Sequence, residues 1–181
     1  MRKIILFCLL LLMISCAVKQ PLFEELSNIK IARDVYGVPH IIAKTDAEVA
    51  YGLAWVQCED DFITMQELMA ACKGLLGEIK GKDGLVADFA IKFMGLKEIA
   101  ETKYNIDVTG DFKIYLESFV DGVNAFAKLN PDKVLLDELF PIKGSDIITG
   151  YLLGNLEISH AGKDLMKILD GTIIKYLKSD V

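Results

Sequence analysis

The chain has 181 residues, of which 52% are hydrophobic and 25% are charged, and its formal net charge is −6. This composition excludes an intrinsically disordered chain, and the length allows one domain of ordinary size or two small ones. An acidic chain without a cluster of Lys and Arg is a poor nucleic-acid binder, so we expect no nucleic-acid partner.

The N-terminus has the pattern of an export signal. Arg2 and Lys3 precede an unbroken apolar run over residues 4–14, which suits a signal peptide and is too short to span a bilayer. No apolar run in the rest of the chain is long enough for a membrane-spanning helix. We therefore expect an exported protein of the periplasm or cell envelope.

A cysteine follows this apolar run at once. Ser15 before Cys16 resembles a bacterial lipobox, although Met13 stands where Leu is usual. We expect a signal peptide over 1–15, a lipidated Cys16 as the first mature residue and membrane anchor, and a tether over 16–27. The alternative is ordinary signal cleavage nearby, with Cys16 incidental.

A β-hairpin is expected at the start of the body. Apolar, mostly β-branched residues around 29–31 and 38–42 flank a turn over 34–37, in which Gly37 supplies a permissive backbone. Pro39 has no N–H to donate, so the second strand begins at or after it or lies at an edge. A lone hairpin is marginal in water, and the chain offers no other convincing strand.

The remaining body is predicted to be helical. Thr45 or Asp46 can cap the first helix, and apolar residues then recur at steps of three and four from Phe62 to Ile79. Further helices are expected over 88–104, from Phe112 to a stop at Asn130–Pro131, from a Ser145 cap to about Ile158, and from an Asp164 cap to Leu177. The stripe from Phe62 is predicted to end at Gly81 and Gly84. The fold class is therefore α+β, mostly helical with one N-terminal hairpin.

Few residue patterns in the chain favour catalysis. The two histidines, His40 and His160, stand in no spacing that suggests a Ser/His/Asp arrangement. We interpret His40 as a structural hydrogen-bonding residue and His160 as a cation at a helix end. The acidic run over 59–61 can bind a cation, but we favour a solvated helix start.

The cysteines of the body are predicted to stay reduced. Cys58 and Cys72 lie fourteen residues apart in one predicted helix. That spacing is about 21 Å along the axis, too far for a disulfide. We expect both to act as small buried hydrophobic residues. No Cys/His spacing suggests zinc, so we predict no metal site.

The segment over 33–41, with the sequence RDVYGVPHI, resembles the opening motif of the penicillin acylase family. Further similarities follow in order: Asp46, the segment 50–60, Gly74, Gly77, Glu78, Gly81, Asp88 and the segment 121–125. Many family members have Arg where Asp61 stands. The resemblance extends from about residue 29 to 169, nearly all of the expected mature chain.

This resemblance implies an N-terminal nucleophile hydrolase with an αββα architecture. In that family a precursor cuts itself into a smaller α chain and a larger β chain, and the new N-terminal Ser of the β chain attacks an amide carbonyl. The α chain mainly shapes the acyl pocket and wraps the β-chain sheet. The chain resembles a leader plus an α chain, with residues 28–181 as the α-chain-like domain.

A β-chain-like partner carrying the N-terminal Ser is therefore expected, and the hairpin would complete the sheet of the hydrolase. We expect no catalytic residue in this chain and no activity from it alone. An N-terminal Cys16 nucleophile, known from other hydrolases of this type, is disfavoured because a lipidated thiol cannot attack.

The resemblance places α-chain pocket residues on the helix over 146–160. Matching the family's Gly to Gly154 puts Leu156, Ser159 and His160 near the pocket, where the family usually has Met or Phe. The alternative for Leu156 is a simple core position. The implied substrate is a small N-acyl amide: penicillin-type amides, N-acyl amino acids and N-acyl homoserine lactones all stay open.

Calcium binds to an α-chain Glu in some family members. The nearest acid here is Asp164, which is offset, so we identify no calcium ligand and expect no cofactor. An ion pair between Arg33 and Asp34 is expected across the hairpin.

Three functions are compatible with these features. We favour the α-chain-like part of a secreted amidohydrolase that cleaves N-acyl amide bonds. The alternatives are an inactive truncated remnant and a stand-alone helical lipoprotein used for binding.

Overall fold

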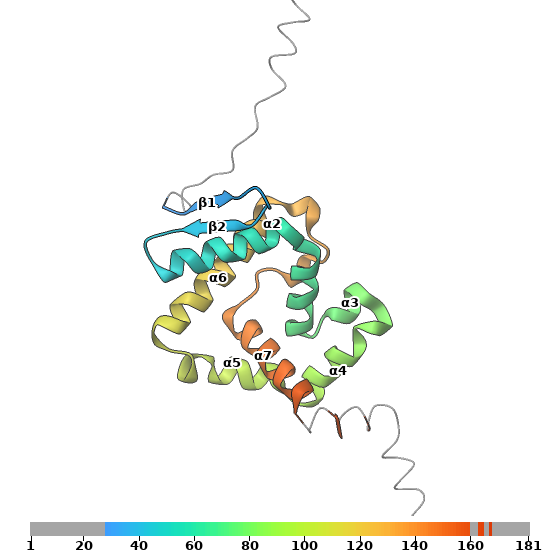
Figure 1. Cartoon of the computed structure of the whole chain (residues 1–181). Helices are drawn as coiled ribbons and strands as arrows, with labels where there is room; N and C mark the ends of the chain where they lie inside the picture. Colours follow the sequence, from blue (N-terminus) through green and yellow to red (C-terminus); the bar gives the residue numbers. More distant parts are fainter. Residues whose placement is uncertain (1–27, 160–162, 165–166, 168–181) are drawn as a thin grey trace, which may run out of the picture.

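The computed structural model of the chain describes residues 28–159, 163, 164 and 167 (Figure 1). A two-stranded hairpin is followed by helices. In chain order the elements are β1 (Lys30–Arg33), β2 (Pro39–Ile42), α2 (Asp46–Lys73), α3 (Leu76–Lys80), η1 (Gly81–Asp83), α4 (Leu85–Phe93), α5 (Leu96–Asp107), α6 (Gly110–Leu129), η2 (Pro131–Lys133), η3 (Asp137–Leu139) and α7 (Gly144–Ile158).

The hairpin is confirmed. Its strands pair antiparallel, with Arg33 opposite Pro39, so Pro39 begins the second strand as expected. The Asp34 carboxylate accepts backbone N–H bonds from Tyr36 at 2.9 Å and Val38 at 3.0 Å, and Gly37 has a φ of 82°. A short polar side chain and a glycine thus close the turn.

Helix α2 begins at a capping box. The Thr45 hydroxyl accepts from the Glu48 backbone N–H, and the Glu48 carboxylate accepts from the Thr45 N–H at 3.0 Å. The helix kinks at Asp61, where φ is −154° and ψ is 82°. The Asp61 carboxylate accepts from the Thr64 N–H at 3.0 Å and from its hydroxyl at 2.7 Å, so it caps the second half of α2.

Three helix boundaries differ from the predicted ones. Helix α2 stops at Gly74, whose φ of 69° is left-handed, so the stripe to Ile79 is not one helix. The prediction of a single helix over 88–104 is wrong, because Gly95, with a φ of 62°, separates α4 from α5. Ser145 does not cap α7: the helix begins at Gly144, and Ser145 is buried in its first turn.

Two other boundaries follow the predictions. Helix α6 ends at Leu129, with Asn130 as its C-cap, and α7 ends at Ile158. The predicted last helix to Leu177 lies outside the described residues except for Asp164 and Lys167. Among the residues that the structure describes, no helix is both long and apolar enough to cross a membrane.

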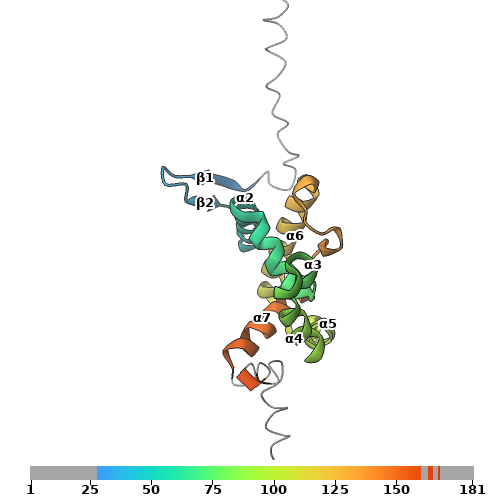
Figure 2. The ribbon, with the colours of Figure 1, turned by 90° about the vertical axis from the view of Figure 1, so that its right-hand side faces the viewer.

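The main core lies between α2 and α6. The Phe126 ring makes edge contacts with Trp55 and Phe62, at centroid distances of 5.2 and 5.0 Å. The hairpin lies at one end of the molecule, while α4, α5 and α7 lie at the other (Figures 1 and 2). The mostly helical prediction is thereby confirmed, whereas completion of the hairpin sheet by another chain stays a prediction.

Two glycines allow close approach around α2. A Cβ at Gly122 of α6 would lie 2.7 Å from the Tyr51 carbonyl oxygen and 2.9 Å from the Ala54 Cβ. A Cβ at Gly52 would lie 2.9 Å from a methyl group of Ile41 on β2. Both glycines belong to the segments that carry the family resemblance, and both serve packing.

Two side-chain amides, one buried and one partly buried, hold the connection from α6 to α7. The Gln66 amide is fully buried; it donates to the Lys133 carbonyl at 3.0 Å and accepts from the Leu135 N–H at 2.7 Å. The Asn124 amide exchanges two bonds with the Ile142 backbone, at 2.8 and 2.9 Å. Since buried backbone groups need partners, these amides fix where α7 starts.

Substitution of the contact glycine gives a direct test of this packing. We expect Gly122→Ala to destabilise the chain by about 1–3 kcal/mol, because the added methyl group meets the Tyr51 backbone and Ala54. The matched control is Gly154→Ala on α7, where a Cβ meets no atom within 4 Å. That change should stabilise by about 0.5–1 kcal/mol through helix propensity. Urea denaturation measures both, and equal effects would contradict the close contact.

Candidate functional site

A charged cluster fastens the hairpin to α2. The Arg33 guanidinium lies 2.7 Å from the Asp60 carboxylate and 3.3 Å from that of Glu59, and donates to the Gly37 carbonyl at 3.0 Å. The Trp55 indole N–H donates to the other Glu59 oxygen at 2.9 Å. The hydrogen bonds to Asp60 and Glu59 raise the pKa of Arg33.

The prediction of an ion pair between Arg33 and Asp34 is wrong. The Asp34 carboxylate is occupied by the hairpin turn, and the N–H groups of Val38 and Tyr36 lower its pKa. The His40 imidazole lies 3.6 Å from the same carboxylate. This distance is longer than a hydrogen bond, so the structural hydrogen-bonding role of His40 stays a prediction.

The three acidic residues of the run over 59–61 have two different structural roles. Glu59 and Asp60 pair with Arg33, whereas Asp61 caps a half-helix. The interpretation of the run as a helix start is therefore confirmed at Asp61. Within the described part of the chain, no group of three or more His, Cys, Asp or Glu residues could hold a metal ion.

The predicted pocket residues lie at the C-terminal end of α7. Leu156 is partly buried and packs against the buried cluster of Ala90, Ile91, Leu96 and Leu153, so in this chain it contributes to a small core. Ser159 ends the helix, and its hydroxyl donates to the Leu156 carbonyl at 2.8 Å. His160 lies outside the described residues. The pocket role of these three residues stays a prediction.

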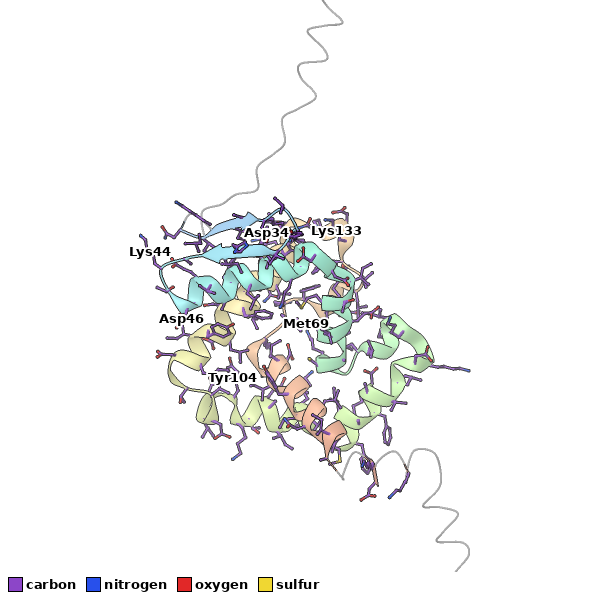
Figure 3. All side chains as sticks on the ribbon, viewed as in Figure 1. Asp34, Lys44, Asp46, Met69, Tyr104 and Lys133 are labelled. Carbon is purple, nitrogen blue, oxygen red and sulfur yellow. The ribbon has the colours of Figure 1, made fainter. Side chains whose placement is uncertain are left out.

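A groove on another face of α7 was missed by the sequence reasoning. It has a volume of about 700 Å³, and we call it the α7 groove. Helices α2, α6 and α7 form its walls, and Met69, labelled in Figure 3, lies at its inner side. The lining residues are Leu53, Gln57, Met65, Leu68, Met69, Cys72, Phe112, Tyr115, Leu116, Phe119, Ile147, Gly150, Tyr151, Gly154, Asn155 and Ile158.

The sequence carried a signal for this groove. Its α7 residues are 147, 150, 151, 154, 155 and 158, which is the spacing of one helix face. Two of these residues are glycines and two are polar, so the sequence does not predict that this helix face belongs to an ordinary hydrophobic core. Their convergence with α2 and α6 depends on tertiary packing, which periodicity alone does not define.

The two thiols of the body are free, as predicted. Burial raises the pKa of Cys58 to about 12. Burial, with a smaller contribution from the Asp146 carboxylate, raises the pKa of Cys72 to about 11. Both thiols are therefore protonated at neutral pH and are poor nucleophiles.

Comparison with known proteins identifies the family. Residues 28–153 match the family model described as Penicillin amidase, which is more than half of the chain. The chain belongs to the penicillin amidase family. This is the penicillin acylase family to which the segment over 33–41 is similar.

Two curated acylases are similar to much of the chain. Penicillin G acylase of Escherichia coli is 30% identical over 115 residues, which cover 62% of this chain. Acyl-homoserine lactone acylase QuiP of Pseudomonas fluorescens is 30% identical over 118 residues, again 62% of this chain. The matched part spans only 14% of the length of either relative.

A solved structure has a similar fold. It is the thermostable penicillin G acylase from Alcaligenes faecalis, with a TM-score of 0.57 and 16% sequence identity. The similarity covers 71% of this chain and 72% of that chain. The helical arrangement described above is therefore a fold found in this family.

Loss of the cluster around Arg33 should loosen the hairpin. We expect Arg33→Met to lower hydrogen-exchange protection of the Ala32 and His40 amides, which form a hydrogen-bonded pair of the hairpin, about two- to fivefold, because partly exposed ion pairs stabilise weakly. The matched control is Lys30→Met on the same strand. Equal loss in both variants would show that the ion pairs do not fasten the hairpin.

Alkylation should report the raised pKa of the thiols. Because the thiolate reacts, the rate at Cys72 should rise about tenfold per pH unit up to pH 9, without the plateau of an ordinary thiol near 8.5. Cys58 should react more slowly than Cys72. Peptide mass spectrometry after N-ethylmaleimide treatment measures both. The urea-unfolded chain is the control, and a native plateau near pH 8.5 would contradict the shift.

Proposed function

We propose that this chain is the α-chain-like part of an exported amidohydrolase that cleaves N-acyl amide bonds with a β-chain-like partner. Membership of the penicillin amidase family supports the reaction class. The similar proteins are named as acylases of penicillin G and of acyl-homoserine lactones, so we propose a small N-acyl amide as the substrate. The matched part of the chain spans only 14% of the length of those proteins.

The exposed hairpin is the observation that carries this proposal. Val35 and Tyr36 at its turn are 93% and 88% exposed, and Val38 and Ile42 are 52% and 63% exposed. A two-stranded sheet is marginal in water, and its outer edges present unpaired backbone groups. Addition to the sheet of another chain would pair an edge and cover these apolar side chains.

The nucleophile is proposed to come from the partner. Both described thiols are held protonated, so neither suits attack on an amide. In the proposed reaction the partner's N-terminal Ser oxygen bonds to the acyl carbon while its proton passes to the α-amino group. The amine departs with that proton, and water then releases the acid from the acyl-enzyme. No cofactor is required for these steps.

The C-terminal end of α7 is proposed to border the acyl group. Leu156 and Ser159 are close to one another at this end, joined by the hydrogen bond to the Leu156 carbonyl, and His160 follows directly in the sequence. Cys16 is proposed to carry the lipid that anchors the chain to a membrane of the cell envelope. Its position directly after an apolar leader supports this assignment.

Mass spectrometry of the tagged chain from the membrane fraction of its native cells tests the proposal. We expect a species that begins at lipidated Cys16, together with a larger chain whose first residue is Ser. The complex should hydrolyse phenylacetyl amides or N-acyl homoserine lactones, whereas the separated chain should not. A lone chain without such a companion would favour a remnant or a binding lipoprotein.

A matched pair of variants locates the contact. Ile42→Lys on the hairpin should lower recovery of the larger chain at least tenfold, because it places a charge at the proposed interface. Ile106→Lys on α5, where the side chain is 68% exposed at the other end of the molecule, should have no effect. Equal recovery with both variants would exclude the hairpin as the docking surface.

A further inference from the structure

We infer that a polar pocket at the start of α7 binds a small zwitterion, an α-amino acid with a polar side chain. All residues of this pocket belong to the present chain, so the inference does not rest on the proposed hydrolase. The pocket is also separate from the predicted substrate-pocket residues, because Leu156 and Ser159 lie at the opposite, C-terminal end of α7.

The polar pocket is formed where three helices meet. Its volume of about 490 Å³ lies within the ordinary range for small-molecule sites. None of its lining residues is Leu, Ile, Val, Met or Phe, so the pocket suits a polar ligand. The lining residues are Glu101, Tyr104 and Asn105 of α5, Glu117 of α6, and Lys143, Gly144 and Ser145 at the start of α7.

Ser145 is the lining residue that points to a missing partner. It is only 8% exposed, yet its hydroxyl has no hydrogen-bond partner among the residues that the structure describes. Side-chain polar groups that are buried to this extent are ordinarily hydrogen-bonded. Because Ser145 lines the polar pocket, a bound molecule can supply the partner that the chain itself does not.

Tyr104 lies at the inner side of the polar pocket; Figure 3 labels it on α5. It is 9% exposed, and its hydroxyl donates to the Glu117 carboxylate at 3.5 Å, near the upper limit for a hydrogen bond. A Cβ at Gly144 would collide with this hydroxyl, so the glycine lets Tyr104 reach the start of α7. The phenolic oxygen can still accept a hydrogen bond from a ligand ammonium.

The carboxylates of the polar pocket come from α5 and α6. The Lys113 ammonium lies 3.7 Å from the Glu117 carboxylate and donates to the Asn105 side-chain oxygen at 2.8 Å. These contacts orient Glu117 and Asn105. Glu101, in contrast, has no ion-pair partner within the described part of the chain. At least one negative charge therefore stays uncompensated and available to an ammonium group.

The start of α7 supplies a positive charge. Within the residues described, the Lys143 ammonium has no ion-pair partner. Burial lowers the pKa of the nearby Lys73, and the ammonium charges of Lys97 and Lys143 lower it further, while the Asp146 carboxylate opposes this shift. Lys143 therefore lies close to other positive charges, and a ligand carboxylate beside it would reduce their repulsion.

This division of charge selects a zwitterion. A simple anion would meet the carboxylates of α5 and α6, and a simple cation would meet Lys143, so each would be repelled by one side of the polar pocket. An α-amino acid presents an ammonium and a carboxylate together. Its polar side chain would lie among amide and hydroxyl groups such as those of Asn105 and Ser145.

Saturation-transfer NMR with L-serine tests the inference. The full chain, with any chain that copurifies, is titrated with L-serine, with glycerate, which lacks the ammonium, and with ethanolamine, which lacks the carboxylate. We expect saturable transfer to L-serine and at least fivefold weaker binding of both analogues, because each loses one charge-assisted contact. Absence of transfer to L-serine, or equal binding of the three compounds, would overturn the inference.

Two exposed charges of the polar pocket locate the site. Glu101→Gln should weaken L-serine at least fivefold without weakening glycerate, and Lys143→Gln should weaken L-serine at least fivefold without weakening ethanolamine. The matched controls are Glu98→Gln and Lys103→Gln, at exposed positions of α5 outside the pocket. Equal L-serine affinity in pocket and control variants would show that binding occurs elsewhere.

A pair of buried hydroxyl groups separates binding from stability. Ser145→Ala should weaken L-serine at least threefold without lowering the melting temperature, because the hydroxyl has no partner in the described chain to lose. In Thr149→Val the lost hydroxyl donates to the Ser145 carbonyl at 3.0 Å and lies outside the polar pocket. That change should lower the melting temperature and leave L-serine affinity unchanged. The reverse pattern would mean that Ser145 serves the fold alone, and the inference would fail.

Discussion

Close contact between α2 and α6 is the constraint on which the rest of the structure depends. Gly122 brings the α6 backbone against Tyr51 and Ala54, and the Phe126 ring then reaches Trp55 and Phe62. The hairpin, α3, α4 and α7 attach to this helix pair, whereas α5 packs mainly on α7. The hairpin packs on the first half of α2, and the connection that leads to α7 is bonded to side chains of both helices.

The attachments combine apolar packing with directed polar contacts. Gln66 and Asn124 each satisfy a backbone donor and a backbone acceptor of the irregular connection between α6 and α7. The Lys73 ammonium donates to the Leu139 carbonyl at 2.8 Å, and its burial lowers its pKa. These contacts hold the irregular connection between α6 and α7 in one position, and this position determines the direction of α7.

Local signals in the sequence predicted most elements but not their breaks. The hairpin turn and the Thr45 cap depend on neighbouring residues, so their chemistry is readable in the chain. Gly74 and Gly95 interrupt helices, although the apolar spacing continues across both glycines. A glycine within such a periodic stretch does not by itself predict a left-handed backbone conformation. The acidic run over 59–61 predicted a helix start, which Asp61 provides, but the sequence did not predict that α2 continues on both sides of this kink. The α7 groove needed three helices to converge, and no local pattern contains that information.

The kink at Asp61 also sets the geometry of the groove. Leu53 and Gln57 come from the half of α2 before the kink, whereas Met65, Leu68 and Met69 come from the half after it. The angle between the two half-helices therefore controls how far apart these parts of one wall stand. The hydrogen bonds from Thr64 to the Asp61 carboxylate lie at this kink, so they help to hold the angle between the half-helix that packs against the hairpin and the half-helix that forms the inner wall of the groove.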